Sequence, residues 1–343
     1  MISQEALAEK AGITRSSVAV HISNLMKKGY IAGKGYVLRS GTYAVVVGGV
    51  NIDIGGRSYG PLVARDSNPG RVQMSLGGVG RNIAHNMALL GLEVHLLTAF
   101  GDDLYAQRIA ASCGELGIDI SRALQVPGGA TSTYLYLCGP DGDMALAVSD
   151  MDICRKITPQ FLASRLSVLN HAQLIVADAN LPAESLRFLA ENCTPPLFVD
   201  PVSTGKAEKL RPVLGRIHTL KPNRMEAELL SGVEIRDEAG LAEAARALLD
   251  TGLRRVFISL GKDGVFAADH RQSLLLPGRP AEAVNATGAG DAFMAGLAWA
   301  YLEGTDLQGT ALAGACAGAI AIEGAETINP ALSAGTLRAR MLQ

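Results

Sequence analysis

Short apolar runs alternate with amphipathic stretches from about residue 43 onward, and this alternation constrains the fold more than any other feature. Helical patterns at 81–90, 104–116, 182–192 and 241–251 separate the runs. Strands that are apolar on both sides need helices on both faces of their sheet. We therefore expect an α/β three-layer sandwich with a central, mostly parallel sheet, and binding sites beyond the carboxyl ends of its strands. The apolar runs are YAVVVGGV (43–50), VHLLTAF (94–100), LIVADA (174–179), LFVDPV (197–202), HTLKPN (218–223) and VFISLG (256–261).

Two stretches break this rhythm. Residues 55–76 are marked by glycine and proline and show no helical pattern, whereas residues 132–150 alternate around a Pro-Asp-Gly turn, as a hairpin does. The two stretches predict a small second sheet, formed by about 55–76 and 131–150. Such a sheet is typical of a lid that covers a substrate.

Residues 1–40 form a separate head. Leu7, Ala8 and Ala11 are followed by a turn at Gly12, and Thr14 is a plausible N-cap for a second helix. In that helix Val18, Ile22 and Leu25 are expected to face inward, and YIAGKGYVL (30–38) predicts a hairpin wing. The segment resembles the winged helix-turn-helix domains of bacterial regulators, which places Arg15, Ser16, Ser17 and His21 where base-reading side chains lie. The helix that normally comes first is missing, so we expect a truncated unit with a docking role or weak DNA binding.

Charge separates this head from the rest of the chain. Residues 1–40 carry six Lys or Arg against Glu5 and Glu9, whereas the remainder carries 25 basic and 31 acidic residues. This imbalance favours an anionic partner for the head alone. The five cysteines form no CxxC pair, and the sequence has neither a signal peptide nor an apolar run long enough to cross a bilayer. We therefore expect a cytoplasmic protein with reduced thiols and no membrane partner.

The stretch NATGAGDAFMAGL (285–297) carries the strongest chemical pattern. Glycines at a helix start let a phosphate approach unpaired backbone amides, which make an anion hole. The same helix end favours an ionised Asp291, and we expect this carboxylate to accept a proton near pH 7. An anion hole beside a carboxylate suits phosphoryl transfer to an alcohol. The alternative is a glycine-rich packing turn in which Asp291 is only a first-turn helix acid.

Three further motifs lie earlier in the chain. GGVGRN (77–82) is a second glycine cluster opening a helix, but VQMSL before it does not have a strand pattern, so the dinucleotide fingerprint does not fit. LKPNRMEAE (220–228) places Asn223 and Glu226 three residues apart, a spacing that suits hydrated Mg²⁺ near phosphates or, equally well, a capping box. SLGKDG (259–264) predicts a tight turn that could line a nucleotide pocket.

Together these motifs resemble the ribokinase-type (PfkB) carbohydrate and nucleoside kinases, over about residues 43–340 and in the same order. The resemblance implies a ribokinase-like kinase domain (41–343) that uses ATP and Mg²⁺. It implies that Asp291 is the base and that Gly288, Ala289 and Gly290 form the anion hole, next to Thr287. It implies that Asn51, Asp53, Gly78 and Asn82 bind the sugar hydroxyls. It implies that Asn223 and Glu226 organise Mg²⁺ and the phosphates, with Glu226 acting through water. Ser259, Gly261 and Gly264 would flank the nucleotide.

Departures from ribokinase bear on the substrate. Val79 replaces a lysine and Asn180 stands where ribokinase has a sugar-binding glutamate, which favours an acceptor bulkier than ribose. The motifs most resemble the pseudouridine kinases of the family, with Asp66 and Asn68 of the lid within reach of the base. Another nucleoside, a free sugar, or a ligand-sensing regulator on a kinase fold are the alternatives. Asn285 replaces an aspartate that helps to bind a monovalent cation, so K⁺ activation is left open. The resemblance also implies a homodimer through the lid sheets.

Overall fold

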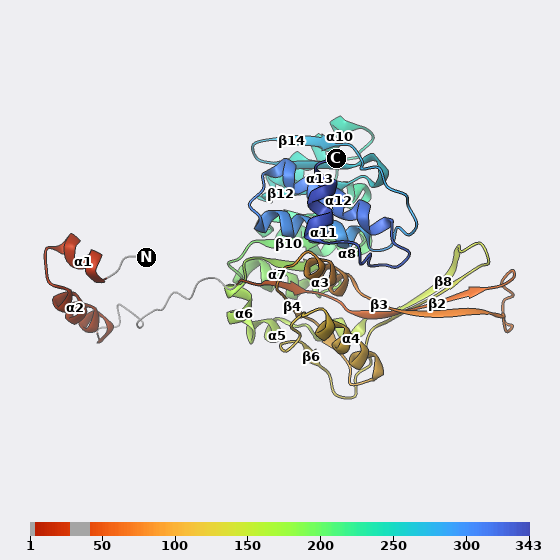
Figure 1. The fold of residues 1–343 in the computed structure, drawn as a ribbon, viewed down its shortest axis with the longest axis horizontal. Helices are drawn as coiled ribbons and strands as arrows, with labels where there is room; N and C mark the ends of the chain where they lie inside the picture. Colours follow the sequence, from red (N-terminus) through yellow and green to blue (C-terminus); the bar gives the residue numbers. More distant parts are fainter. Residues whose placement is uncertain (1–3, 28–41) are drawn as a thin grey trace. The chain divides into compact units, whose positions relative to one another are not determined.

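The computed structural model describes residues 4–27 and 42–343, and it divides into two units, 1–40 and 41–343 (Figure 1). The two units are described separately. Within the described residues, no helix is both long and apolar enough to cross a bilayer.

The first unit contains helices α1 (Gln4–Ala11) and α2 (Arg15–Lys27). Gly12 takes a left-handed φ of 64° between them, and the predicted N-cap is confirmed, because the Ser17 amide donates to Thr14 Oγ1 at 3.2 Å. Val18 is buried as expected, but the inward orientation of Leu25 was wrong, since Leu25 is 40% exposed. Eight residues of α1 span about 12 Å and cannot cover the roughly 20 Å of α2. The expected wing at 30–38 lies outside the described residues.

The second unit is built on an eight-stranded sheet of order β14-β13-β12-β11-β10-β9-β1-β4. Neighbours from β4 to β12 are parallel, whereas β13 and β14 are antiparallel additions, so the expected mostly parallel sheet is confirmed. A two-stranded sheet of β5 (Ala99–Phe100) and β6 (Leu124–Gln125) lies apart from it. The strands are β1 (Ala44–Val47), β4 (Val94–Leu97), β9 (Ile175–Asp178), β10 (Leu197–Asp200), β11 (Thr219–Leu220), β12 (Arg255–Ser259), β13 (Val265–Asp269) and β14 (Ser273–Leu276).

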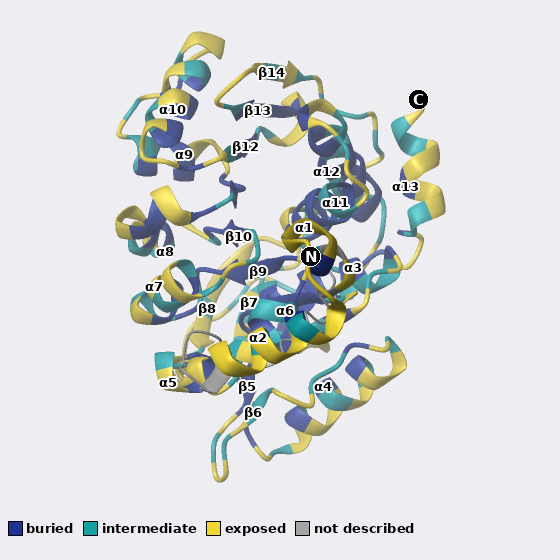
Figure 2. Ribbon diagram, turned by 90° about the vertical axis from the view of Figure 1, so that its left-hand side faces the viewer, coloured by how far each residue is buried: buried dark blue, intermediate teal, exposed yellow. Residues whose placement is uncertain are grey.

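Helices cover both faces of this sheet, with α7 to α10 on one side and α3, α11 and α12 on the other (Figure 2). Alternate residues of β1 belong to two cores: Ala44 and Val46 pack with α3 and α11, and Val45 and Val47 pack with the opposite layer. Burial on both faces explains why the strands are continuously apolar. The helices are α3 (Val79–Leu89), α4 (Leu104–Glu115), α5 (Pro159–Ala163), α6 (Leu166–His171), α7 (Ala183–Asn192), α8 (Thr204–Ala207), α9 (Arg224–Ser231), α10 (Glu238–Asp250), α11 (Ala289–Leu302), α12 (Leu307–Ile322) and α13 (Ala334–Met341), with 3₁₀ turns at Asp152–Lys156, Glu208–Arg216 and Gly261–Asp263.

A four-stranded sheet of order β3-β2-β7-β8 stands off the main one (Figure 1) and is the predicted second sheet. It consists of β2 (Asn51–Ser58), β3 (Gly70–Gly77), β7 (Thr133–Cys138) and β8 (Met144–Asp150). The expectation that VQMSL is not a strand was wrong, because these residues belong to β3. Its side chains are mostly exposed, so the apolar burial that marks the main strands is absent there. We call this sheet the lid sheet.

Candidate active site

Charged side chains are buried at the carboxyl ends of three neighbouring parallel strands. Asp178 ends β9, Asp200 ends β10 in register with it, and Lys221 follows β11. Lys221 Nζ lies 3.1 Å from Asp200 Oδ2, and both side chains are 7% exposed. Burial by itself lowers the pKa of Lys221, but the nearby carboxylates of Asp200, Glu226 and Asp291 outweigh it and hold that pKa above its ordinary value. A permanent positive charge therefore lies inside this edge of the sheet.

Asp291, in the first turn of α11, faces this charge. The Asn82 amide of α3 donates to Asp291 Oδ2 at 2.9 Å. Burial, together with the charge of Asp200, raises the pKa of Asp291 to about 8, although Asn82 and Lys221 favour the carboxylate. The expectation of a carboxylate ionised by the helix end was therefore wrong at neutral pH, because desolvation exceeds the effect of the helix end. A group with this pKa can exchange protons near pH 8.

The turn before α11 presents backbone amides to the same space. Gly288 has a φ of 82°, and a Cβ there would lie 2.3 Å from the Thr327 carbonyl oxygen, so the position requires glycine. The first helical bond runs from the Ala292 amide to Gly288, which leaves the preceding amides of Gly290 and Asp291 without a helical acceptor. A Cβ on Gly290 would lie 3.3 Å from Lys221 Nζ. Amides and ammonium together form an anion-binding position beside Asp291.

The other glycine cluster serves close packing of the backbone. A Cβ on Gly80 would lie 2.8 Å from the Gly48 Cα, and one on Gly78 would lie 2.5 Å from the Val50 Cα. Asp178 fixes the same crossing, since its Oδ2 accepts from the Gly49 amide at 2.9 Å. These contacts bring the start of α3, with Asn82, against the end of β1.

The start of β2 brings two of the expected sugar-binding residues to this place. Asn51 Nδ2 donates to Asp53 Oδ1 at 2.6 Å, and Asn51 is buried. A Cβ on Gly77 would lie 2.2 Å from Asp53 Oδ2, so the carboxylate lies directly against the glycine cluster. Asn51, Asp53, Gly78 and Asn82 are thus brought together, and Asn82 connects them to Asp291.

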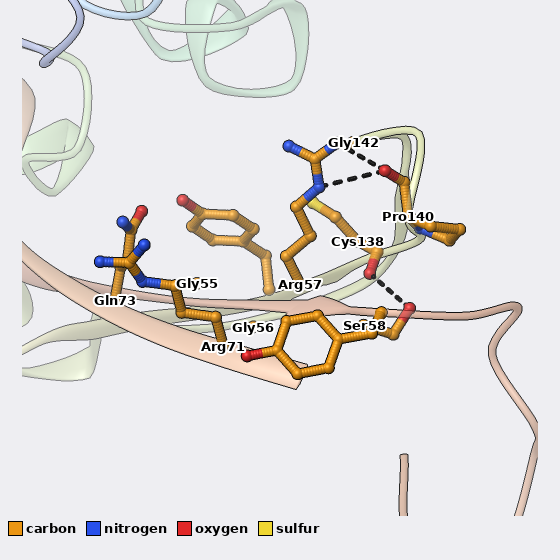
Figure 3. A pocket seen from close by; sticks show the side chains of 11 residues that line it. Gly55, Gly56, Arg57, Ser58, Arg71, Gln73, Cys138, Pro140 and Gly142 are labelled. Atoms are coloured by element: carbon orange, nitrogen blue, oxygen red, sulfur yellow. Dashed lines mark hydrogen bonds between the residues drawn. The ribbon is translucent and has the colours of Figure 1, made fainter. Parts of the chain in front are cut away.

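Farther along the lid sheet, the face that carries Asp53 contains a pocket of about 620 Å³ (Figure 3). Residues paired directly across neighbouring strands share a face, and Gly55 pairs with Gln73 on one side and Tyr136 on the other. A Cβ on Gly55 would lie 2.5 Å from the Tyr136 ring, so the ring lies over bare backbone. Arg57 and Arg71 form the next row, with the Arg57 guanidinium donating to the Pro140 carbonyl. The pocket offers an aromatic face and amide and guanidinium donors.

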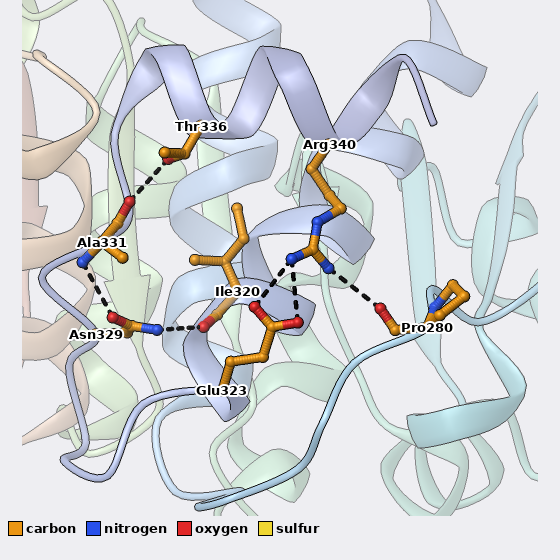
Figure 4. Close-up of polar contacts among 7 residues, drawn as sticks. All are labelled: Pro280, Ile320, Glu323, Asn329, Ala331, Thr336 and Arg340. Atoms are coloured by element: carbon orange, nitrogen blue, oxygen red, sulfur yellow. Dashed lines mark hydrogen bonds and ion pairs between the residues drawn. The ribbon is translucent and has the colours of Figure 1, made fainter.

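The loop that contains Thr327, whose carbonyl lies against Gly288, is flanked by contacts from α13 and α12 (Figure 4). Arg340 of α13 holds both carboxylate oxygens of Glu323, at 3.0 and 2.9 Å, and donates to the Pro280 carbonyl. Asn329 donates to the Ile320 carbonyl at 2.7 Å and accepts from the Ala331 amide. The segment at Pro280, before the glycine turn, and the loop at 323–331, which packs against it, are therefore held by hydrogen bonds to α12 and α13.

Residues expected at the nucleotide form a neighbouring group. Asn223 and Glu226 make a complete capping box at the start of α9, in which the Asn223 amide donates to Glu226 Oε2 at 2.9 Å. Asn223 also pairs with Ser259 in an isolated bridge. Gly261 and Gly264 take left-handed φ values of 60° and 108° in the tight turn after β12, which confirms that turn. Among the described residues, no group of three or more His, Cys, Asp or Glu side chains could hold a metal ion by itself.

Four expected residues make other contacts. Asn180 Oδ1 accepts from Lys206 Nζ at 2.5 Å. Asn68 is partly buried and bonds within its own loop, to Val63 and to the carbonyl of Asp66. Asn285 Oδ1 accepts from the Thr287 amide at 2.9 Å. Base contacts by Asp66 and Asn68, and a monovalent cation at Asn285, stay predictions.

Asp178, Asp200 and Lys221 were missed by the sequence reasoning. A detectable pattern was present, because each follows an apolar run directly, in LIVADA, LFVDPV and HTLKPN. Charged residues at that position of parallel strands lie at the binding edge.

Comparison with known proteins identifies the family. Residues 41–334 match the pfkB family carbohydrate kinases, and residues 2–32 match winged helix-turn-helix DNA-binding segments. The chain therefore belongs to the pfkB carbohydrate kinase family, whose members are ATP-dependent phosphotransferases.

Several individual proteins of known sequence or structure are similar to this chain. The chain is 42% identical to the pseudouridine kinase of Escherichia coli over 269 residues, 78% of this chain and 86% of the relative. It is 40% identical to the uncharacterized sugar kinase YeiI of Escherichia coli over 338 residues, 97% and 93% of the two chains. A carbohydrate kinase from Agrobacterium tumefaciens has the same fold, with a TM-score of 0.78 and 29% identity over 88% of this chain and 97% of that one. The ribokinase-like fold expected from the motifs is confirmed.

Proposed function

We propose that this chain phosphorylates the 5′-hydroxyl of pseudouridine with ATP, giving pseudouridine 5′-phosphate. The 42% identity to a pseudouridine kinase supports the substrate. The observation that carries the chemistry is the buried centre in which Asp291 lies beside Lys221 and the first-turn amides of α11.

In this proposal Asp291, in its ionised form, accepts the proton of the nucleoside hydroxyl. The hydroxyl oxygen bonds to the γ-phosphorus of ATP while the bond from that phosphorus to ADP breaks, so that ADP leaves. The amides of Gly290 and Asp291, with Lys221, stabilise charge on the transferred group. Gly288 and Ala289, which the resemblance placed in the anion hole, instead shape the turn that exposes these amides, since the Ala289 amide donates to the Ala286 carbonyl at 3.4 Å. Asn82 orients the Asp291 carboxylate, while Asn51 and Asp53 hold sugar hydroxyls.

ATP would lie along the turn that contains Gly261 and Gly264, near Asn223, Ser259 and Thr287. Mg²⁺, when bound with ATP, would neutralise the phosphates. Because the described residues lack a dedicated metal cluster, the ion would keep several waters, and Glu226 would contact it through one of them.

The lid pocket supports a nucleoside over a free sugar. Successive residues on one face of a strand are about 6.7 Å apart, so the row of Gln73, Gly55 and Tyr136 lies one row beyond Asp53. A sugar held at Asp53 would leave room for a planar base over this row. Free ribose would leave the row without a contact.

Side-by-side kinetics test this proposal. We expect kcat/KM to be higher for pseudouridine than for ribose, because ribose lacks a base. Uridine is the sharper control, since it differs in its glycosidic linkage and keeps a similar shape. A higher kcat/KM for ribose, or for another nucleoside, would show that this compound and not pseudouridine is the preferred acceptor.

We also propose a homodimer through the opposite face of the lid sheet. Val72, Leu137, Leu146 and Val148 point to that face and are 40% to 71% exposed. A contiguous exposed apolar face is typical of an interface. In sedimentation experiments the wild type should be a dimer, and the double variant Leu137→Asp with Leu146→Asp should be a monomer. The same sedimentation mass for variant and wild type would contradict the proposed interface.

A further inference from the structure

A concave basic patch lies at the edge of the main sheet opposite the candidate active site. The cavity measures about 540 Å³ and is lined by His218, Arg254, Arg255, Asp269, His270 and Arg271. Arg255 begins β12, whereas Ser259, at its other end, belongs to the expected nucleotide group. Five strand residues separate the two edges by about 13 Å.

The arginines of this patch lie close together and are not neutralised by ion pairs. Arg254, Arg255 and Arg271 make no ion pair within 4 Å among the described residues. Asp269, the acid of the patch, uses Oδ1 to accept the amides of Arg271 and Gln272 at 2.8 and 3.0 Å. Some exposed arginines elsewhere do have an acidic partner, such as Arg155 with Asp152 and Arg236 with Glu234.

A buried donor atom and a partly buried histidine belong to this patch. Arg255 Nη1 is buried and has no hydrogen-bond partner among the described atoms. A buried donor without an acceptor is costly, so it indicates a missing partner. Burial and the charges of Arg255 and Arg254 lower the pKa of His218 to about 4, so this ring is neutral at pH 7. The positive charge of the patch therefore comes from its guanidinium groups.

We propose that this patch binds a small oxyanion of the phosphate class. Guanidinium groups bind such oxyanions through paired, charge-assisted hydrogen bonds. The anion would supply the acceptor that Arg255 Nη1 lacks and would offset the repulsion among three like charges. The site is separate from the catalytic anion position and needs no phosphoryl transfer to operate.

Calorimetric titration with inorganic phosphate tests the site, using the full-length protein with its active site saturated by Mg²⁺ and a non-hydrolysable ATP analogue. Sodium chloride keeps the ionic strength constant. The test variant is Arg254→Ser with Arg271→Ser, both at exposed positions. The control is Arg155→Ser with Arg236→Ser, which removes the same charge from arginines that have acidic partners. Thermal unfolding verifies that each variant folds, and Arg271→Ser alone replaces the double variant if it does not.

We expect phosphate affinity to fall at least about tenfold in the test variant and to stay within about twofold of wild type in the control. Sulfate should compete with phosphate, and chloride at the same ionic strength should not. Equal affinity in all three proteins would place the phosphate elsewhere and overturn the proposal. No binding to wild type, or equal displacement by chloride, would also overturn it.

Discussion

The candidate active-site edge of the main sheet and the lid sheet of this kinase differ in which side chains they bury. At the edge of the main sheet that holds the candidate active site, Asp178, Asp200, Lys221 and Asp291 are buried, and Lys221 pairs with Asp200. In the lid sheet, apolar side chains such as Val72 and Leu146 are exposed, while the other face is polar. The edge is fixed by the packing of the whole domain, whereas the lid sheet depends on strand pairing and on what covers it. We infer that changes at the edge alter the rate of chemistry and that changes in the lid alter the choice of substrate.

The largest expected effect is at Asp291. Asp291→Asn should lower kcat at least about a hundredfold, the scale of general-base removal, while nucleoside binding stays near normal. Asp237→Asn, at the N-cap of α10, is the matched control and should keep full activity. Near-normal turnover of Asp291→Asn would mean that Asp291 is only a helix-start acid.

Asp291→Asn should also be more stable than the wild type at high pH. The pKa of Asp291 is raised from 3.8 to about 8 on folding, so the unfolded chain loses this proton first and wild-type stability falls between pH 4 and 8. Asparagine has no such dependence. The excess free energy of unfolding of Asp291→Asn over wild type should therefore grow with pH across that range, measured by urea unfolding.

A further prediction concerns the pH dependence of turnover. Because the base must be ionised, kcat/KM should rise with pH and level off above about pH 8, the pKa of the buried Asp291 carboxyl. One group with that pKa gives a rise of about fiftyfold from pH 6 to pH 8. A flat profile over this interval would show that the proton is accepted elsewhere.

Lys221 should show a smaller effect on kcat. Lys221→Met alone would leave Asp200 buried without its partner, which is strongly destabilising. The useful variant therefore combines Lys221→Met with Asp200→Asn, so that neither charge is left alone. It should fold and lower kcat by roughly ten- to a hundredfold through lost charge stabilisation. Unchanged kcat would limit Lys221 to a structural role.

In the lid the expected effect is on selectivity. Gln73→Ala should lower kcat/KM for pseudouridine by about tenfold, the scale of one lost hydrogen bond, and leave ribose turnover unchanged. Gln107→Ala on α4 is the control. An equal loss for both substrates would show that Gln73 supports the sheet and does not select the base.

The smallest effect is expected for the head. Deleting residues 1–40 should leave turnover within about threefold, since they form a separate unit. The full-length protein should bind DNA weakly, with a Kd on the order of micromolar or higher at physiological salt, the non-specific range. Nanomolar binding to a defined operator would instead favour the alternative function of a ligand-sensing transcription regulator on a kinase fold.

Much of this architecture could be predicted from the sequence because burial on both faces leaves continuous apolar runs. The glycine motifs located Asp291 and Asn82, but their 2.9 Å contact joins residues 209 positions apart and has no local pattern. The pKa of Asp291 depends on desolvation by the assembled core. Sequence reasoning saw only the helix start, which acts in the opposite direction. Leu25 was misplaced because periodicity gives a face without showing whether a partner covers it.

The attachment of α13 has a practical consequence for the handling of this protein. Arg340 lies on α13, yet its bonds to Glu323 and Pro280 secure the loops that border the glycine turn. Proteolytic cleavage before Arg340 would release these loops and leave every strand of the main sheet in the chain. We expect such a cleaved preparation to keep its strands and to lose turnover. A mass measurement showing that α13 is intact is therefore a criterion of sample quality for kinetic work.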